Sequence, residues 1–179
     1  PNQRFNDNRD GTVTDKLTGL MWLKDAGCLK KSWNSALQTV ADLNANPRRY
    51  NCLDYSAQYS DWRMPNIREL ESLVNFASSN IASWLNSNGF GNFKSYNYWS
   101  STIQPIRNRY LNVWVLNMSN GMDTTVYNSA TSYLLPVRTS SVEKPYDLPK
   151  TGQTISYAAG DDGTIQAGIE WPNPRFTDN

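Results

Sequence analysis

Residues 61–70 read Asp61-Trp62-Arg63-Met64-Pro65-Asn66-Ile67-Arg68-Glu69-Leu70, and this stretch holds the clearest helix start in the chain. Asn66 follows a proline and has a glutamate three residues later, which is the arrangement of a capping box. We therefore predict a helix over residues 66–76. Its apolar residues recur at helical spacing and would cover a sheet: Ile67, Leu70, Leu73 and Val74.

A second helix is predicted upstream, over residues 32–44. Ser32 can cap its start, and Asn44 to Tyr50, with Pro47, would end it. The other regular elements are predicted to be strands with Asn- and Gly-rich turns. The first is a hairpin over 4–23, and an aromatic and hydroxyl-rich strand follows over 96–102. A strong strand over 110–117 returns over 122–127, and a short strand covers 134–138. The predicted fold class is α+β, with mixed or antiparallel sheets, two amphipathic helices and long loops.

Composition excludes several function classes. The chain of 179 residues has a net charge of +1, which favours neither nucleic acid nor an anionic membrane surface as a partner. No apolar run is long enough to cross a bilayer. Because the chain contains no His, the Ser–His and Cys–His catalytic pairs and imidazole metal sites are absent. We expect a protein that is not an enzyme and has no cofactor.

Cys28 and Cys52 are too far apart for a C-x-x-C motif. We expect a disulfide between them, and the alternative is two buried thiols of a cytosolic protein. A disulfide and a polar, His-free composition together predict a secreted or cell-surface location.

The two ends of the chain resemble each other. Residues 1–8 read Pro-Asn-Gln-Arg-Phe-Asn-Asp-Asn and residues 172–179 read Pro-Asn-Pro-Arg-Phe-Thr-Asp-Asn. This predicts a tandem repeat, with a domain at 1–140 and a linker plus the start of the next unit at 141–179. Neighbouring copies would then join through strands that contain Arg4 and Phe5 in one copy and Arg175 and Phe176 in the other. The alternative is that two edges of one sheet need similar residues.

The later part of the chain changes character. Residues 144–152 have no periodicity and predict a linker. Residues 155–158 and 164–169, on either side of Gly160-Asp161-Asp162-Gly163, suggest a small hairpin.

Three stretches, in this order along the chain, carry a resemblance to a known family. They are residues 10–22, residues 61–70, and Tyr98-Trp99-Ser100-Ser101-Thr102 together with Pro136-Val137-Arg138. Over about residues 4–139 the chain resembles the bacterial Lcl C-terminal domain family, also called DUF1566. The resemblance implies a C-type-lectin-like fold, found in secreted proteins, often in tandem. Some relatives are surface adhesins that bind glycans or glycosaminoglycans. The related formylglycine-generating enzymes need reactive cysteines in the later strands, which this chain lacks there.

In such folds the loops between the later strands form the recognition face, so loops 103–110 and 127–133 are the candidate ligand surface. The alternative is ordinary solvated loop. Their side chains combine cations, an aromatic ring and hydrogen-bonding groups. The candidate ligand-binding residues are Arg107, Asn108, Arg109, Tyr110, Asn128 and Thr131.

Three further groups have a structural and a functional interpretation. The aromatic side chains Trp22, Trp33, Trp62, Trp99 and Trp114 are expected in the core, with sugar stacking as the alternative. We expect Asp61, Arg63, Glu69 and Arg138 to form an ion-pair network that anchors loops rather than a catalytic cluster. Asn6, Asn8 and Asp10 resemble a calcium loop, but Leu17 stands where a bidentate Glu is needed, so a turn is favoured.

The sequence therefore predicts an extracellular or cell-surface binding and adhesion module that recognises a glycan or a protein. The alternative is a structural subunit of a surface fibre or stalk, assembled head to tail through the duplicated end strand.

Overall fold

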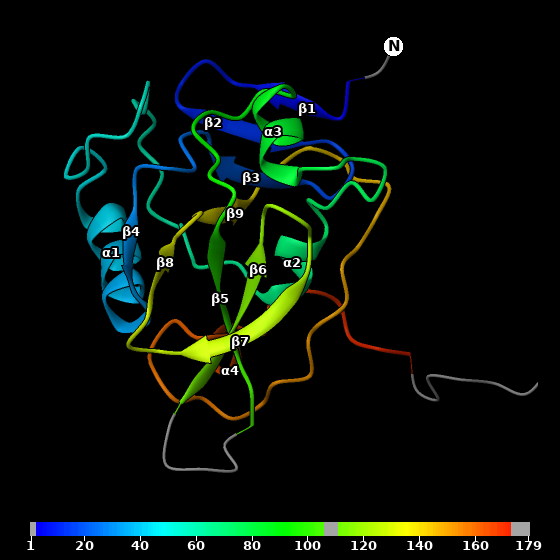
Figure 1. The fold of residues 1–179 in the computed structure, drawn as a ribbon. Helices are drawn as coiled ribbons and strands as arrows, with labels where there is room; N and C mark the ends of the chain where they lie inside the picture. Colours follow the sequence, from blue (N-terminus) through cyan, green and yellow to red (C-terminus); the bar gives the residue numbers. More distant parts are fainter. Residues whose placement is uncertain (1–2, 106–110, 173–179) are drawn as a thin grey trace, which may run out of the picture.

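The structure is a computed structural model that describes residues 3–105 and 111–172. It consists of two sheets with short helices packed around them, which confirms the predicted α+β class (Figure 1). The first sheet is antiparallel and contains, in spatial order, β1 (Phe5–Asp7), β2 (Thr12–Asp15), β3 (Leu20–Leu23) and β9 (Val137–Thr139).

The second sheet is mixed. Its spatial order is β4 (Lys30–Ser32), β8 (Thr131–Tyr133), β5 (Asn97–Ile103), β6 (Asn112–Asn117) and β7 (Asp123–Tyr127). β5 and β8 run parallel and the other neighbours antiparallel. The two longest strands, β5 and β6, are interior strands, and β7 forms one edge.

The predicted first helix is present as α1 (Trp33–Ala45), but Ser32 does not cap it with its side chain. The Ser32 hydroxyl donates to Ser35 Oγ, and the backbone N–H of Trp33 donates to the carbonyl of Asn128 at 3.0 Å. A backbone group from the β7–β8 turn therefore satisfies this first helical N–H.

The predicted second helix begins as expected and ends early. α2 (Ile67–Glu71) has the full capping box, in which Asn66 Oδ1 accepts from the Glu69 N–H at 3.0 Å and Glu69 Oε2 accepts from the Asn66 N–H at 2.9 Å. After Glu71 the Leu73 N–H donates to the Leu70 carbonyl and the Val74 N–H donates to the Glu71 carbonyl, so three-residue turns replace further helix. The next helix, α3 (Ile81–Asn86), was not predicted; Asn80 caps it.

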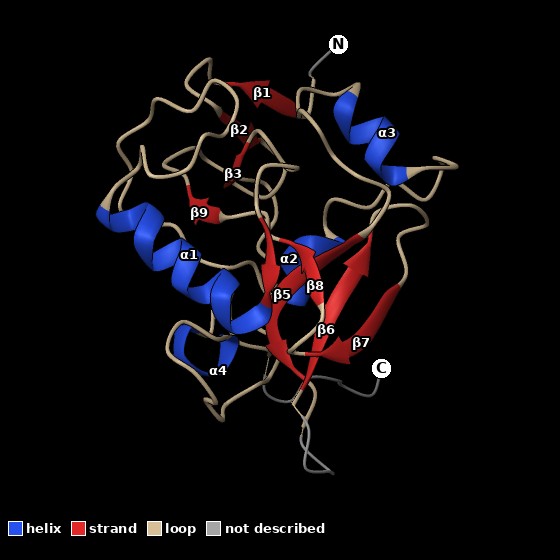
Figure 2. Cartoon of the chain, turned by 60° about the vertical axis from the view of Figure 1, so that its left-hand side comes forward, coloured by secondary structure: helices blue, strands red, loops and turns tan. Residues whose placement is uncertain are grey.

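The core lies between the sheets and the helices (Figure 2). Residues far apart in the chain meet there: β5 contributes Tyr98 and Trp99, β6 contributes Val113 and Val115, and α2 contributes Leu70, all of them inaccessible to solvent. α2 contacts both β5 and β6, as an amphipathic helix on a sheet should.

The C-terminal segment (residues 140–172) packs along the body of the domain. In Figure 1 it is the yellow-orange to red part of the chain, and it includes α4 (Asp162–Ile165), which lies beside β5. The predicted small hairpin around residues 160–163 is wrong. Asp161 instead caps α4, because its carboxylate accepts from the Thr164 N–H at 2.9 Å.

Candidate ligand-binding site

A pocket of about 290 Å³ lies where β5 ends against the C-terminal segment. We call it the Trp114 pocket. Its sheet side consists of Thr102, Ile103, Pro105 and Trp114, and its other side consists of residues 151–155 and Tyr157. The pocket is thus built from two parts of the chain that are about fifty residues apart.

Trp114 differs from the other motif tryptophans. Trp22, Trp33, Trp62 and Trp99 are at most 2% exposed, which confirms the core interpretation for them. Trp114 is half-buried and lines the pocket, because it alternates in β6 with the fully buried Val113 and Val115 and therefore lies on the opposite face of the sheet. Trp114 was expected in the core with the others, and its alternation with Val113 and Val115 is the signal that could have separated it.

The wall formed by the C-terminal segment is attached to β5 by hydrogen bonds. The Ile103 N–H donates to Gln153 Oε1 at 2.6 Å, and Thr102 Oγ1 donates to the carboxylate of Asp162 at 2.8 Å. Thr151 Oγ1 donates to the same carboxylate oxygen at 2.5 Å. Thr102 also accepts from the Ile67 N–H, so β5, α2 and α4 meet at one hydroxyl.

Asp162 is 1% exposed, and its burial raises the pKa of this carboxyl above the ordinary value. The hydrogen bonds from Thr151 and Thr102 act in the opposite direction, and the nearby Glu69 adds to the increase. Asp162 was not among the predicted site residues, because nothing in the sequence of residues 160–163 indicates that they pack against a strand sixty residues away.

The predicted ligand loops are partly within the described residues. Arg107, Asn108, Arg109 and Tyr110 lie outside them. Ile103 and Pro105, at the start of the same loop, line the Trp114 pocket.

The other predicted loop, 127–133, includes the end of β7, a turn and all of β8. Asn128 lies in the turn, where its N–H donates to the carbonyl of Leu111 at 3.1 Å. Thr131 is exposed on β8, opposite Ser32. Neither Asn128 nor Thr131 lines the Trp114 pocket.

The four charged motif residues form two ion pairs. Arg63 holds Glu69 with two hydrogen bonds of 2.6 and 2.5 Å, and both side chains are largely buried. Arg138 holds Asp61 with bonds of 2.6 and 3.0 Å, which lowers the pKa of Asp61. The backbones of Arg63 and Val137 exchange two hydrogen bonds of 2.9 Å, and together with the Arg138–Asp61 pair these bonds fasten loop 61–66 to β9. The Arg63–Glu69 pair fastens the same loop to α2. The expectation of an anchoring network is confirmed.

These anchors lie inside a recognised domain, because the family model of the Lcl C-terminal domain matches residues 11–138. The chain belongs to the Lcl C-terminal domain family. Comparison with curated proteins gave no match. The match ends before the C-terminal segment, so the Lcl C-terminal domain provides only the sheet side of the Trp114 pocket.

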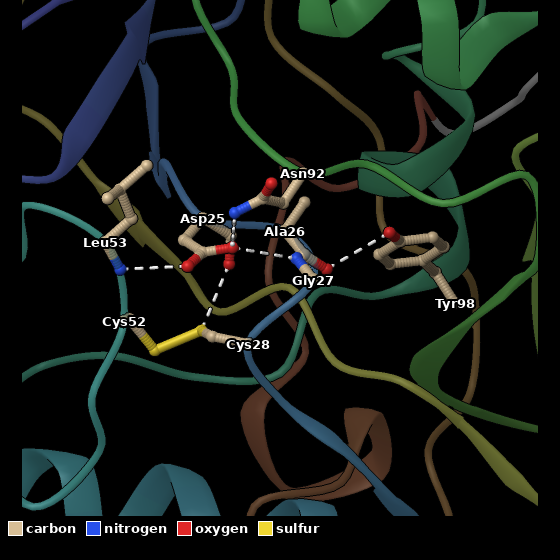
Figure 3. Close-up of a disulfide and its surroundings, with 8 residues drawn as sticks. All are labelled: Asp25, Ala26, Gly27, Cys28, Cys52, Leu53, Asn92 and Tyr98. Atoms are coloured by element: carbon tan, nitrogen blue, oxygen red, sulfur yellow. Dashed lines mark hydrogen bonds between the residues drawn. A yellow bond between two sulfur atoms is a disulfide. The ribbon is translucent and has the colours of Figure 1, made fainter.

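Within the Lcl C-terminal domain, the predicted disulfide between Cys28 and Cys52 is present (Figure 3). Beside it, the carboxylate of Asp25 accepts from the Leu53 N–H at 2.8 Å and from the Asn92 side chain at 3.0 Å. Covalent and hydrogen bonds therefore attach the long loop after α1 to the segment that follows β3.

Arg4 and Phe5, which precede the residues matched by the family model, are anchored in the body. Arg4 pairs with the buried carboxylate of Asp15 at 2.6 Å. Phe5 is 2% exposed, with edge-to-face contacts to Phe90 and Trp84. Arg175 and Phe176 lie outside the described residues, so the pairing of copies through the two end strands stays a prediction.

The turn at 6–11 satisfies its own side chains. Asn6 donates to Asn8 Oδ1, Asn8 donates to Thr12 and Thr14, and Asp10 accepts from the N–H and the hydroxyl of Thr12. Residues 3–105 and 111–172 contain no group of three His, Cys, Asp or Glu side chains that could hold a metal ion. In the same ranges, no helix has the length and hydropathy needed to span a membrane.

Proposed function

We propose that this Lcl C-terminal domain protein is an extracellular recognition module with a C-type-lectin-like fold, which binds a glycan or protein ligand rather than catalysing a reaction. The Trp114 pocket is the observation that supports the proposal most directly. Its volume of about 290 Å³ is near the lower end, roughly 300 Å³, of small-molecule sites, and it combines an aromatic side chain with neutral polar groups.

The position of the pocket also favours recognition. Ile103 and Pro105 belong to the predicted ligand loop 103–110, so a ligand in the pocket would lie against that loop. Arg107 and Tyr110 belong to the same predicted loop of the sequence. The disulfide supports an extracellular location, because such bonds persist mainly in oxidising compartments.

A glycan array tests this proposal. The wild-type protein should capture a defined set of glycans, and Arg107→Ala and Tyr110→Ala should weaken capture without lowering Tm. Arg48→Ala, a change on the loop after α1, is the matched control and should leave capture unchanged. If the wild-type protein captures no glycan on the array, the glycan ligand is excluded and only a protein ligand is left for this module.

A second candidate function is that of a structural subunit assembled head to tail. Its support is the way β1 is fixed at the edge of the first sheet, through the Arg4–Asp15 pair and the buried Phe5 ring. Arg175 and Phe176 have the same spacing and would begin an equivalent strand, in a following unit or on a neighbouring copy.

Light scattering tests assembly. Deleting residues 173–179 keeps Trp171, whose indole N–H donates to the Lys150 carbonyl, and should abolish chain-to-chain association. Arg175→Ala with Phe176→Ala should do the same in the full chain. If the wild-type and truncated proteins have the same number of chains per particle at all concentrations, this candidate is excluded.

A further inference from the structure

We infer that the Trp114 pocket accepts one uncharged sugar ring of a neutral glycan. The inference names the ligand class for the proposed recognition function and rests on that function.

No charged side chain lines the described part of the pocket. Two carboxyl groups lie behind this wall: Asp162 accepts a hydrogen bond from each of Thr102 and Thr151, and Asp161 accepts from the Tyr157 N–H at 2.7 Å. A sulfate or a carboxylate in the pocket would therefore meet no cation from the described wall and would approach a buried acidic group. Desolvating an anion without a charged partner is costly, so this wall favours an uncharged ligand.

The wall also has two kinds of surface, as a sugar ring does. Ile103, Pro105 and Trp114 provide an apolar side, against which the C–H face of a pyranose can pack. Across the pocket, Thr154 and Tyr157 carry hydroxyl groups that make no hydrogen bond with any described residue, and the same is true of the Trp114 indole N–H. Hydroxyls that both donate and accept are suited to the hydroxyls of a sugar.

The topology disfavours an extended peptide as the ligand. Peptides that extend a sheet need an unpaired strand edge. β5 and β6, which carry the sheet side of the pocket, are both interior strands, since β5 lies between β8 and β6, and β6 lies between β5 and β7. The volume of about 290 Å³ suits a single sugar residue of a longer chain better than a folded protein surface.

Calorimetric titration of the full chain tests the inference. The neutral probes are maltohexaose, cellohexaose and N-acetyllactosamine, and the anionic probes are heparin and hyaluronan. At least one neutral probe should bind with an affinity that is almost the same at low and high salt, because no ion pair forms. Trp114→Ala should weaken this binding by about tenfold or more.

Conservative variants separate a contact from a folding defect. Thr154→Val and Tyr157→Phe each remove one exposed hydroxyl and should weaken binding by about two- to tenfold with Tm unchanged. Trp84→Ala is the matched control, because Trp84 is also half-buried but packs on Phe5 outside the pocket. It should leave the affinity for the neutral probe unchanged.

The outcomes distinguish this inference from the proposed function. Binding of heparin or hyaluronan alone, weakened by salt, overturns the ligand class and leaves the recognition function standing. Neutral binding that survives Trp114→Ala, Thr154→Val and Tyr157→Phe overturns the assignment to this pocket. Absence of binding to every neutral probe overturns the inference, and if the glycan array is also blank, glycan recognition fails with it.

Discussion

Thr102 Oγ1 donates a 2.8 Å hydrogen bond to the buried carboxylate of Asp162, and this contact joins the C-terminal segment to β5. The same Thr102 hydroxyl accepts from the Ile67 N–H at 3.0 Å, so it connects the start of α2 to α4. Because Thr102 and residues 151–155 form opposite walls of the Trp114 pocket, the pocket depends on this attachment.

Replacing Thr102 with Val should destabilise the protein. The change keeps the shape of the side chain but removes the partner of the Ile67 N–H and one donor to Asp162, at a cost of about 3 kcal/mol for the buried groups left unpaired. Urea unfolding measures this loss. Thr124→Val, on the exposed face of β7, is the control and should change the free energy of unfolding by less than about 0.5 kcal/mol.

The stability of the protein should depend on pH through Asp162. Burial raises the pKa of this carboxyl in the folded state above the 3.8 of the unfolded chain, so the folded protein binds more protons between the two values. The contribution of Asp162 to the free energy of unfolding should therefore fall as pH rises from 3.8 through the folded pKa, and then level off.

A comparison with Asp162→Asn isolates this effect, since Asn does not titrate. Asp7 and Asp61 have lowered pKa values, so their stabilisation is lost as pH falls below 3.8, and it cancels in the difference between the two proteins. Unfolding measured across the acid range should give a difference that slopes in the stated direction. A flat difference would show that Asp162 has an ordinary pKa.

Removing the disulfide should lower stability through the unfolded chain. Cys28 and Cys52 are 24 residues apart, which corresponds to about 3.5 kcal/mol in the loop-entropy description. The double variant Cys28→Ser with Cys52→Ser should lose roughly that amount in denaturant unfolding. Adding a reductant should shift the wild type to the same value and leave the double variant unchanged; equal stability with and without the bond would contradict the prediction.

Two buried tryptophans should respond differently to the same substitution. Within the described part of the chain, Trp22 Nε1 is buried without a hydrogen-bond partner, whereas Trp33 Nε1 donates to the Ser100 carbonyl at 2.9 Å. Trp22→Phe removes an unpaired donor, but Trp33→Phe breaks a hydrogen bond. Thermal unfolding should show that Trp33→Phe costs about 1 kcal/mol more, and the reverse order would contradict this account.

Local signals in the sequence predicted much of the fold. The capping box of Asn66 and Glu69 was visible because both partners lie within one helical turn, and strand β6 was visible from its β-branched and aromatic composition. The ion pairs of Arg63 and Arg138 were expected because forked guanidinium groups suit loop anchoring.

Features that depend on distant residues were missed. The docking of the C-terminal segment rests on contacts such as the one between Thr102 and Asp162, and neither residue has a local pattern that reveals the other. Similarly, Ser32 was expected to cap α1 with its side chain. Instead, the first N–H of α1, that of Trp33, donates to the backbone carbonyl of Asn128. The Trp114 pocket could not be predicted because half of its wall comes from such a segment.

The most direct test of the central claim is chemical-shift mapping of the isotopically labelled protein with a neutral glycan. The account predicts that the indole resonance of Trp114 and the amides of Thr154 and Tyr157 shift together and saturate at one affinity. Shifts confined to another surface, such as the Lys30, Tyr96 and Tyr133 cluster at the β4 edge, would contradict it.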